Sequence, residues 1–158
     1  MPATRRAALL TGAALLLAGC GLSIPTDPDG TLDRIRAEGV LRVGASPRPG
    51  WVETGDGQPG GREPRLVAAF ADDLGAEVEW TVAGEEELVR LFEDGKLDLA
   101  VGGFTEDNAW VDKVGLTRAY TEVVVSGTTE AHVMMVPMGE NALQSQLERW
   151  LDVHGGGA

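Results

Sequence analysis

The chain has 158 residues, 43% of them hydrophobic and 24% charged, and this composition is typical of one ordinary globular domain. Its formal net charge of −12 argues against nucleic-acid binding, because phosphates attract basic proteins. The same acidity disfavours electrostatic docking on anionic lipid. A single cysteine cannot form an internal disulfide, so it must be free, paired between chains or chemically modified.

Residues 1–19 have the pattern of an export signal, because Arg5 and Arg6 precede an apolar run over residues 7–18. The run is too short to span a bilayer permanently. It ends in Leu-Ala-Gly-Cys, which resembles the lipobox of bacterial lipoproteins and implies lipidation of Cys20 after cleavage. We therefore expect a lipid-anchored protein on the extracytoplasmic face of the cell membrane. An uncleaved apolar helix with a buried cysteine is the alternative, and the export route, Sec or twin-arginine, is open.

Residues 20–30 are rich in proline, glycine and aspartate and predict a flexible tether. A short helix is then expected over residues 31–38 and a strand over 40–45. The following residues, 46–61, hold three prolines and five glycines and predict a surface loop.

The middle of the chain alternates between helical and strand periodicity. Helices are predicted over residues 64–74 and 85–94, and strands over 77–82 and 97–101. This order of strand, helix, strand, helix and strand favours an α/β sheet with right-handed crossovers.

Towards the carboxyl terminus, residues 114–117 and 122–125 look extended, and a turn at 126–129 precedes a further strand over 133–136. A closing helix is predicted over residues 141–153, followed by a disordered tail over 154–158. Residues 31–153 are thus expected to form one three-layer α/β lobe. Its sheet is predicted to be mainly parallel, with about five strands plus one antiparallel return strand, and with helices on both faces.

Four stretches resemble the extracellular solute-binding proteins of family 3, the polar-amino-acid receptors of ABC importers. They are residues 35–45, 61–75, 88–103 and 133–143; the third contains the sequence LFEDGKLDLAVGG. The resemblance implies a first lobe whose outgoing and return strands are joined by a tight turn. The second lobe of the family is then absent, and such a turn is compatible with neighbouring antiparallel strands.

The resemblance also implies which residues face the ligand. The family's carboxylate-binding arginine falls on Trp110, whose indole cannot replace a guanidinium. Glu85 stands where an aromatic residue usually covers the ligand, and Ser46 where an acidic residue is common. The expected ligand face comprises Ser46, Trp51, Glu85, Gly103, Thr105 and Trp110. Trp110 is equally compatible with a core position in its own lobe.

The expected function is that of a non-enzymatic lipoprotein, either the substrate-binding component of an ABC importer or a reduced derivative that takes up a small polar solute weakly. The alternatives are a single-lobe interaction lipoprotein that contacts a permease or another envelope protein, a receptor that rebuilds its cleft as a homodimer, a relative of prephenate-type dehydratases, and a degenerate product. No cofactor is expected. A soft-metal site at His132, Met134, Met135 and Met138 competes with a plain core role for the methionines.

Overall fold

The structure is a computed structural model that describes residues 27–55 and 57–155. The predicted signal segment, Cys20 and most of the predicted tether lie outside the described residues. Within the described part of the chain, no helix has the length and apolar character needed to cross a membrane.

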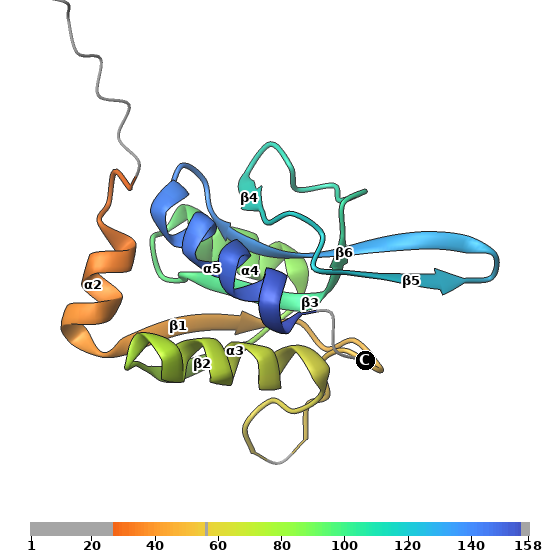
Figure 1. Cartoon of the computed structure of the whole chain (residues 1–158), viewed down its shortest axis with the longest axis horizontal. Helices are drawn as coiled ribbons and strands as arrows, with labels where there is room; N and C mark the ends of the chain where they lie inside the picture. Colours follow the sequence, from red (N-terminus) through yellow and green to blue (C-terminus); the bar gives the residue numbers. More distant parts are fainter. Residues whose placement is uncertain (1–26, 56, 156–158) are drawn as a thin grey trace, which may run out of the picture.

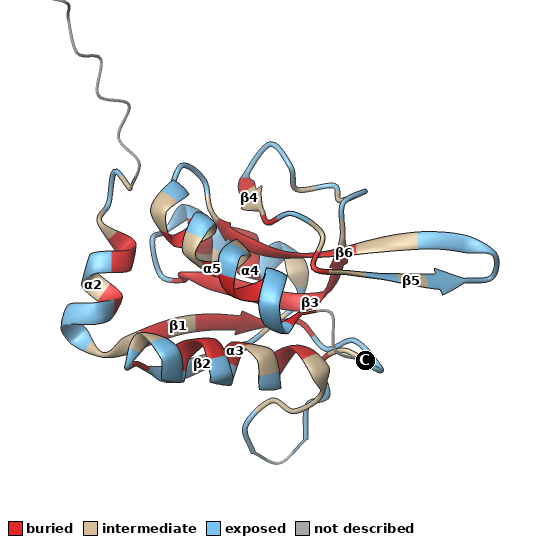
Figure 2. Cartoon of the chain, in the orientation of Figure 1, coloured by how far each residue is buried: buried red, intermediate tan, exposed pale blue. Residues whose placement is uncertain are grey.

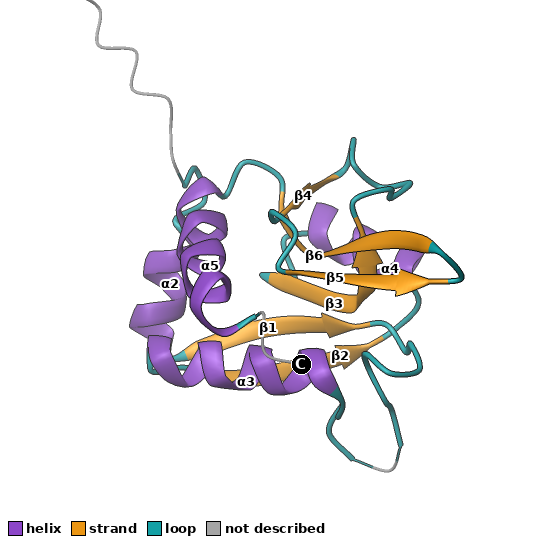
Figure 3. Cartoon of the chain, turned by 45° about the vertical axis from the view of Figure 1, so that its right-hand side comes forward, coloured by secondary structure: helices purple, strands orange, loops and turns teal. Residues whose placement is uncertain are grey.

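Among residues 27–55 and 57–155, four helices surround the sheet, and Figure 3 shows them packed around the strands. They are α2 (Thr31–Glu38), α3 (Arg62–Leu74), α4 (Glu85–Glu93) and α5 (Asn141–His154). Helix α3 shows how the local sequence determines a helix. Its apolar residues recur at helical spacing, and Gly75 ends it in the left-handed region at φ 71°. The buried Phe70 side chain of this helix alone contributes roughly 2 kcal/mol of burial free energy.

The strands form one six-stranded mixed sheet (Figure 1). They are β1 (Val40–Ala45), β2 (Glu77–Val82), β3 (Leu99–Thr105), β4 (Val114–Leu116), β5 (Thr121–Val125) and β6 (Thr128–Pro137). The order is β2-β1-β3-β6-β4, and β5 also pairs with β6. Strand β1 runs parallel to both β2 and β3, so the carboxyl ends of these three strands meet at one edge.

Strands β5 and β6 form a hairpin that projects from the body of the lobe at the right of Figure 1. Ser126 and Gly127 connect them, with φ values of 52° and 84°. Positive φ at both central residues is the requirement of a type I′ turn, whose twist matches that of paired strands. Strand β6 then continues into the sheet beside β3, which confirms the predicted return of the chain into the same lobe.

The sheet separates two apolar layers, visible in Figure 2 as buried segments on both sides of the strands. Helices α2, α3 and α5 cover one face, where the larger cluster includes Ile35, Phe70 and Leu147. Helix α4 covers the other face through Leu88, Val89 and Phe92. The predicted three-layer α/β lobe with helices on both faces is therefore confirmed.

The structure departs from the sequence prediction in several details. The antiparallel part of the sheet is larger than one return strand, because β6 pairs antiparallel with β3, β4 and β5. Strand β3 extends to Thr105, and β6 begins at Thr128 in a polar stretch. Helix α5 includes His154, which the sequence had assigned to the tail, and the ring of this residue stacks on Trp150 at a centroid distance of 4.2 Å.

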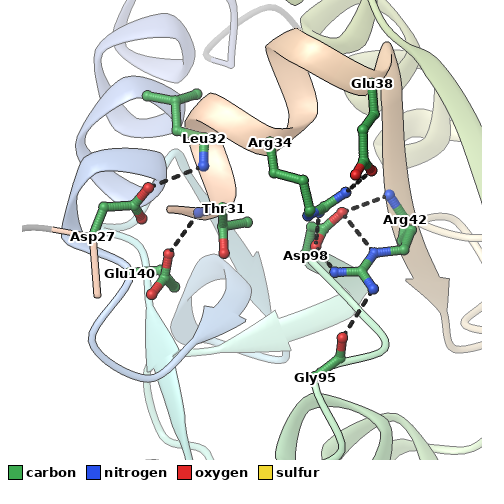
Figure 4. A network of polar contacts seen from close by, with 9 residues as sticks. All are labelled: Asp27, Thr31, Leu32, Arg34, Glu38, Arg42, Gly95, Asp98 and Glu140. Atoms are coloured by element: carbon green, nitrogen blue, oxygen red, sulfur yellow. Dashed lines mark hydrogen bonds and ion pairs between the residues drawn. The ribbon is translucent and has the colours of Figure 1, made fainter. Parts of the chain in front are cut away.

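The last residues of the predicted tether are attached to the lobe. Glu140 accepts hydrogen bonds from the backbone N–H groups of Asp29, at 3.0 Å, and Thr31, at 3.2 Å. Asp27 Oδ2 accepts one from the Leu32 N–H at 3.1 Å. Figure 4 shows the Thr31–Glu140 and Asp27–Leu32 contacts at the amino end of α2. Residues 27–30 therefore belong to the folded unit and not to a free linker.

Candidate binding face

The candidate face lies at the edge where the parallel strands end. Ser46 follows β1 directly, and its N–H donates to the Val101 carbonyl of β3 at 2.8 Å. The residue is buried, and its Cβ lies so close to Gly102 that a Cβ added there would stand 2.8 Å away. Ser46 therefore packs against β3 and does not project into solvent.

Trp51 sits on a tight turn just beyond Ser46. The Arg48 N–H donates to the Val52 carbonyl at 2.9 Å, and the Trp51 N–H donates to the Arg48 carbonyl at 2.9 Å. The indole lies against Gly103, which has φ +61° and where a Cβ would come within 2.8 Å of Trp51 Cγ. Only glycine satisfies both the backbone conformation and the close approach of the ring.

Trp51 is held on two further sides. Its ring stacks on His132 with a centroid separation of 3.8 Å, and the Arg62 guanidinium lies 5.2 Å from the indole centroid. Arg62 Nη2 also donates to Thr121 Oγ1 at 3.2 Å. The aromatic surface is therefore fixed in place by stacking and by a cation–π contact.

Glu63 binds the β3 backbone at the same edge of the sheet. It was not identified from the sequence. This wholly buried carboxylate accepts hydrogen bonds from the N–H groups of Gly102, at 2.9 Å, and Gly103, at 2.8 Å, and from the Tyr120 hydroxyl at 2.7 Å. Burial raises the pKa of Glu63 in spite of these donors. Burial and the neighbouring Glu63 also raise the pKa of Tyr120. The network fixes the backbone on which Trp51 rests.

A cleft of about 390 Å³ opens between the end of β3 and the β5–β6 hairpin; we call it the hairpin cleft. Its lining residues are Arg48, Thr105, Glu106, Asp107, Thr128, Thr129, Glu130 and Ala131. Thr105 is the last residue of β3 and lies opposite His132 of β6. Its Oγ1 donates to the Asp107 carbonyl at 3.2 Å, which leaves the hydroxyl oxygen as an acceptor at the cleft wall.

His132 lies at the inner end of this region and was not among the predicted ligand residues. Its side chain is 1% exposed, and within the described residues neither ring nitrogen has a hydrogen-bond partner. Nε2 lies 3.8 Å from Glu130 Oε2. Burial lowers the pKa of His132, although the nearby Glu130 carboxylate acts in the opposite direction.

Glu85 and Trp110 form a separate contact. Trp110 Nε1 donates to Glu85 Oε2 at 3.3 Å, and the indole packs against the α4 side of the core as a partly buried residue. Both residues line a hollow of about 670 Å³ on the outer side of α4, together with charged residues of that helix and Lys113. The structure thus brings Ser46, Trp51, Gly103 and Thr105 together and pairs the other two predicted residues elsewhere.

The methionines that raised the soft-metal hypothesis do not converge. Met134 belongs to the core layer under α3 and α5, Met135 to the layer under α4, and Met138 is 54% exposed. In the part of the chain that the structure describes, there is no group of three or more histidine, cysteine or acidic side chains placed to hold a metal ion. Met134 and Met135 are core residues.

Comparisons with known proteins place the chain among relatives of the expected kind. The family of bacterial extracellular solute-binding proteins, family 3, matches residues 41–154. A membrane-bound lytic murein transglycosylase F of Pseudomonas fluorescens is 34% identical over 119 residues, which are 73% of this chain and 23% of that protein. The same enzyme of Vibrio cholerae is 33% identical over 93 residues, 58% of this chain and 17% of that protein. The chain therefore spans less than a quarter of these curated relatives.

Solved structures establish the fold. The arginine-bound form of domain 1 from TmArgBP superposes with a TM-score of 0.69 at 22% identity, covering 77% of this chain and 98% of that domain. An ancestral cationic amino acid solute-binding protein has a TM-score of 0.70 at 16% identity, covering 79% of this chain and 93% of that one. The match to an isolated first domain agrees with a single-lobe architecture.

Proposed function

The chain belongs to the bacterial extracellular solute-binding proteins, family 3, and on that premise we propose that it is a non-enzymatic, lipid-anchored binding lobe outside the cytoplasmic membrane. In this proposal it serves as the substrate-binding component of an ABC importer and binds a small polar solute at the carboxyl edge of its sheet. In this proposal, binding of the solute requires no cofactor. The protein's partner on the membrane is the permease of the importer.

The observation that carries the proposal is the assembled edge itself. Ser46, Trp51, Gly103 and Thr105 converge there although they come from two strands and a loop. The buried Glu63 holds the β3 backbone, so the surface is organised before any ligand arrives. A rigid aromatic surface beside a polar cleft is a common form of small-molecule site.

A single lobe can be sufficient for such a role. The first domain of TmArgBP has been solved alone in an arginine-bound form, so in that protein one domain holds the amino acid. An open lobe buries less of a ligand than a closed pair of lobes does. We therefore expect weaker binding than in two-lobed receptors.

The binding test uses the full chain, purified from membranes in mild detergent. Isothermal titration against the twenty amino acids and a set of short peptides is expected to give saturable heat for at least one compound. The same compound should raise the melting temperature. Flat titrations and unchanged melting across the whole set contradict the proposed function.

The anchor is tested separately, because Cys20 carries that part of the proposal. Cells fed radioactive palmitate are expected to label the wild-type chain and leave the Cys20→Ser variant unlabelled. The variant should also move from the membrane fraction to the soluble extracytoplasmic fraction. Equal membrane retention of both forms refutes lipid anchoring at this residue.

A second candidate function is that of an interaction lobe that contacts another envelope protein. The observation in its favour is Trp110, which stands where the family's carboxylate-binding arginine is expected and is engaged with Glu85 instead. The matched relatives, in which the similar region is a minor part of a membrane-bound murein transglycosylase, also favour a role beside another unit. Crosslinking of the lipidated protein in cells tests this candidate, and light scattering tests the homodimer.

A further inference from the structure

The β5–β6 hairpin leaves one edge of its outer strand without a neighbour. Strand β5 pairs with β6 along residues 121–125. On its other side, no strand pairs with β5 and no further backbone hydrogen bond reaches residues 121–125 within the described chain. Figure 1 shows the tip of the hairpin clear of the helices and of the other strands. The outer edge of β5 therefore offers free N–H and C=O groups to a further strand.

The side chains near the tip of β5 are apolar although they are exposed. Val124 is 69% exposed and Val125 is 45% exposed, and among the large exposed apolar residues of the described chain only these two are adjacent in sequence. Together with Val123 they form a run of β-branched residues, which favour strands. Lysine and proline, which commonly protect free edges, are absent from residues 121–129. The edge therefore has the properties of a pairing surface.

The geometry of the turn sets which residues of β5 face outward. A two-residue turn places Val125 and Thr128 in the hydrogen-bonded pair beside it. Because hydrogen-bonded and non-hydrogen-bonded pairs alternate along an antiparallel ladder, Val124 belongs to a non-hydrogen-bonded pair with Thr129. The N–H and C=O groups of Val124 then point away from β6. A new strand would pair through this residue.

We infer that β5 of one chain pairs antiparallel with β5 of a second copy, about a two-fold axis at Val124. In this register Val124 lies opposite its own counterpart, and Val123 of each chain lies opposite Val125 of the other. The two hairpins then form one four-stranded antiparallel sheet. Such an interface uses the same patch on both chains and closes at two copies.

The charge pattern of the strand favours this occupant and this register. Glu122, the only charged residue of β5, comes to lie opposite Ser126 of the second copy, so that no carboxylate faces another. Pairing centred on Val123 would instead bring the two Glu122 side chains into diagonal proximity. It would also draw in Thr121, whose hydroxyl already accepts a hydrogen bond from Arg62 at 3.2 Å. The valine run is therefore complementary to itself.

The contact between two hairpins is small, so the dimer is expected to be weak and to form at high protein concentration. Each chain also carries a formal net charge of −12, which opposes association. Salt screens this repulsion, so the association is expected to strengthen as the salt concentration rises. The inference goes beyond the proposed function, because binding of a solute by one lobe does not depend on it.

Cysteine crosslinking tests the register in the full chain, purified in mild detergent with Cys20→Ser as background so that the introduced cysteine is the only thiol. In Val124→Cys the two cysteines face each other with Cα atoms about 5.5 Å apart, a separation that suits a disulfide. This variant is expected to form disulfide dimers about tenfold faster than Val153→Cys, because pairing raises the local concentration of the thiols. Val153, at 77% exposure on α5, is the matched control. A mixture of Val123→Cys and Val125→Cys chains should crosslink faster than either chain alone.

Sedimentation equilibrium in the same background measures the association itself. The mass is expected to rise with protein concentration up to about 0.5 mM, and Val124→Lys should associate several-fold more weakly because lysine protects an edge. Since Val124 is exposed, the melting temperature of that variant should match the parent. A monomer at every concentration and salt, equal association of parent and Val124→Lys, or equal disulfide rates at positions 124 and 153 overturns the inference. The panel of solutes decides the proposed function separately.

Discussion

A pair of carboxyl groups at the amino end of α2 should make stability depend on pH. Burial, followed by the neighbouring Glu140, raises the pKa of Asp27 to about 6. Although burial opposes it, hydrogen bonds from Asp27 and from the backbone of residues 29 and 31 hold the pKa of Glu140 below its usual range. Below about pH 6 the Asp27–Glu140 pair in Figure 4 therefore holds one proton, on Asp27. Within the described residues Asp27 Oδ1 has no other hydrogen-bond partner.

The direction of the pH effect follows from the raised pKa of Asp27. The folded state binds the Asp27 proton more tightly than the unfolded state, whose carboxyl titrates near 3.8. This contribution to the free energy of unfolding is complete below pH 4 and is lost as the pH rises through about 6. The ceiling is about 3 kcal/mol over the whole range, and screening by solvent at this partly exposed position reduces it to about 1 kcal/mol.

The perturbation is Asp27→Asn, which has the shape of the protonated acid at every pH. Its amide can donate towards Glu140 while its oxygen still accepts from the Leu32 N–H. Between pH 5 and pH 8 the wild type is expected to lose about half of this screened contribution, ~0.5 kcal/mol, relative to the variant, because the other half is lost below pH 5. Over this range Glu140 is ionised in both the folded and the unfolded state, so the difference reports on Asp27.

Urea unfolding followed by tryptophan fluorescence at pH 5, 6, 7 and 8 measures the effect. Asp73→Asn, at an exposed carboxylate on α3, is the control and should shift stability by the same small amount at every pH. A difference between wild type and Asp27→Asn that stays constant from pH 5 to pH 8 refutes a shared proton at this junction.

Three further substitutions probe the supports of the binding face and the lobe. Tyr120→Phe removes the hydroxyl that donates to Glu63 at 2.7 Å and should cost about 2 kcal/mol in urea unfolding, because it leaves a buried carboxyl oxygen without this hydrogen-bond donor. Gly103→Ala places a Cβ 2.8 Å from Trp51 Cγ at φ +61°, so it should cost about 2 kcal/mol and shift the tryptophan emission. Asp98→Asn breaks a buried pairing with two arginines, one contact being 2.6 Å, and should lower the free energy of unfolding by about 3 kcal/mol.

Much of the fold was predictable because its elements carry clear local periodicity. The strands over residues 40–45 and 77–82 and the helix over 31–38 have the predicted bounds. Strand β6 was predicted too short, since its first residues are polar and exposed in the hairpin and carry no apolar pattern. Their extended form comes from pairing with β5 across a type I′ turn, and that pairing is a tertiary consequence.

The candidate face was predictable only in part. The resemblance named Ser46, Trp51, Gly103 and Thr105, which lie at one edge of the sheet but whose contact with a ligand stays a prediction. Glu63 in the sequence looks like an ordinary acidic residue in the first turn of a helix. Its burial depends on the approach of the β3 backbone, which no local pattern encodes. Arg48 and His132 were missed for the same reason. One sits in a proline- and glycine-rich loop and the other in a strand, and only the packing of Trp51 brings them together.

The two-residue turn between β5 and β6 has a direct consequence for binding. Because Ser126 and Gly127 return the chain at once, nothing between these strands can cover the carboxyl edge of the sheet. A ligand on this open face stays exposed to solvent, so charged contacts must supply much of its affinity and remain open to screening by salt. Raising the salt from 20 to 500 mM should therefore weaken binding of a charged solute from the titration panel several-fold. An affinity that does not change with salt would argue that the solute is held by apolar contacts on Trp51 and not by charged groups.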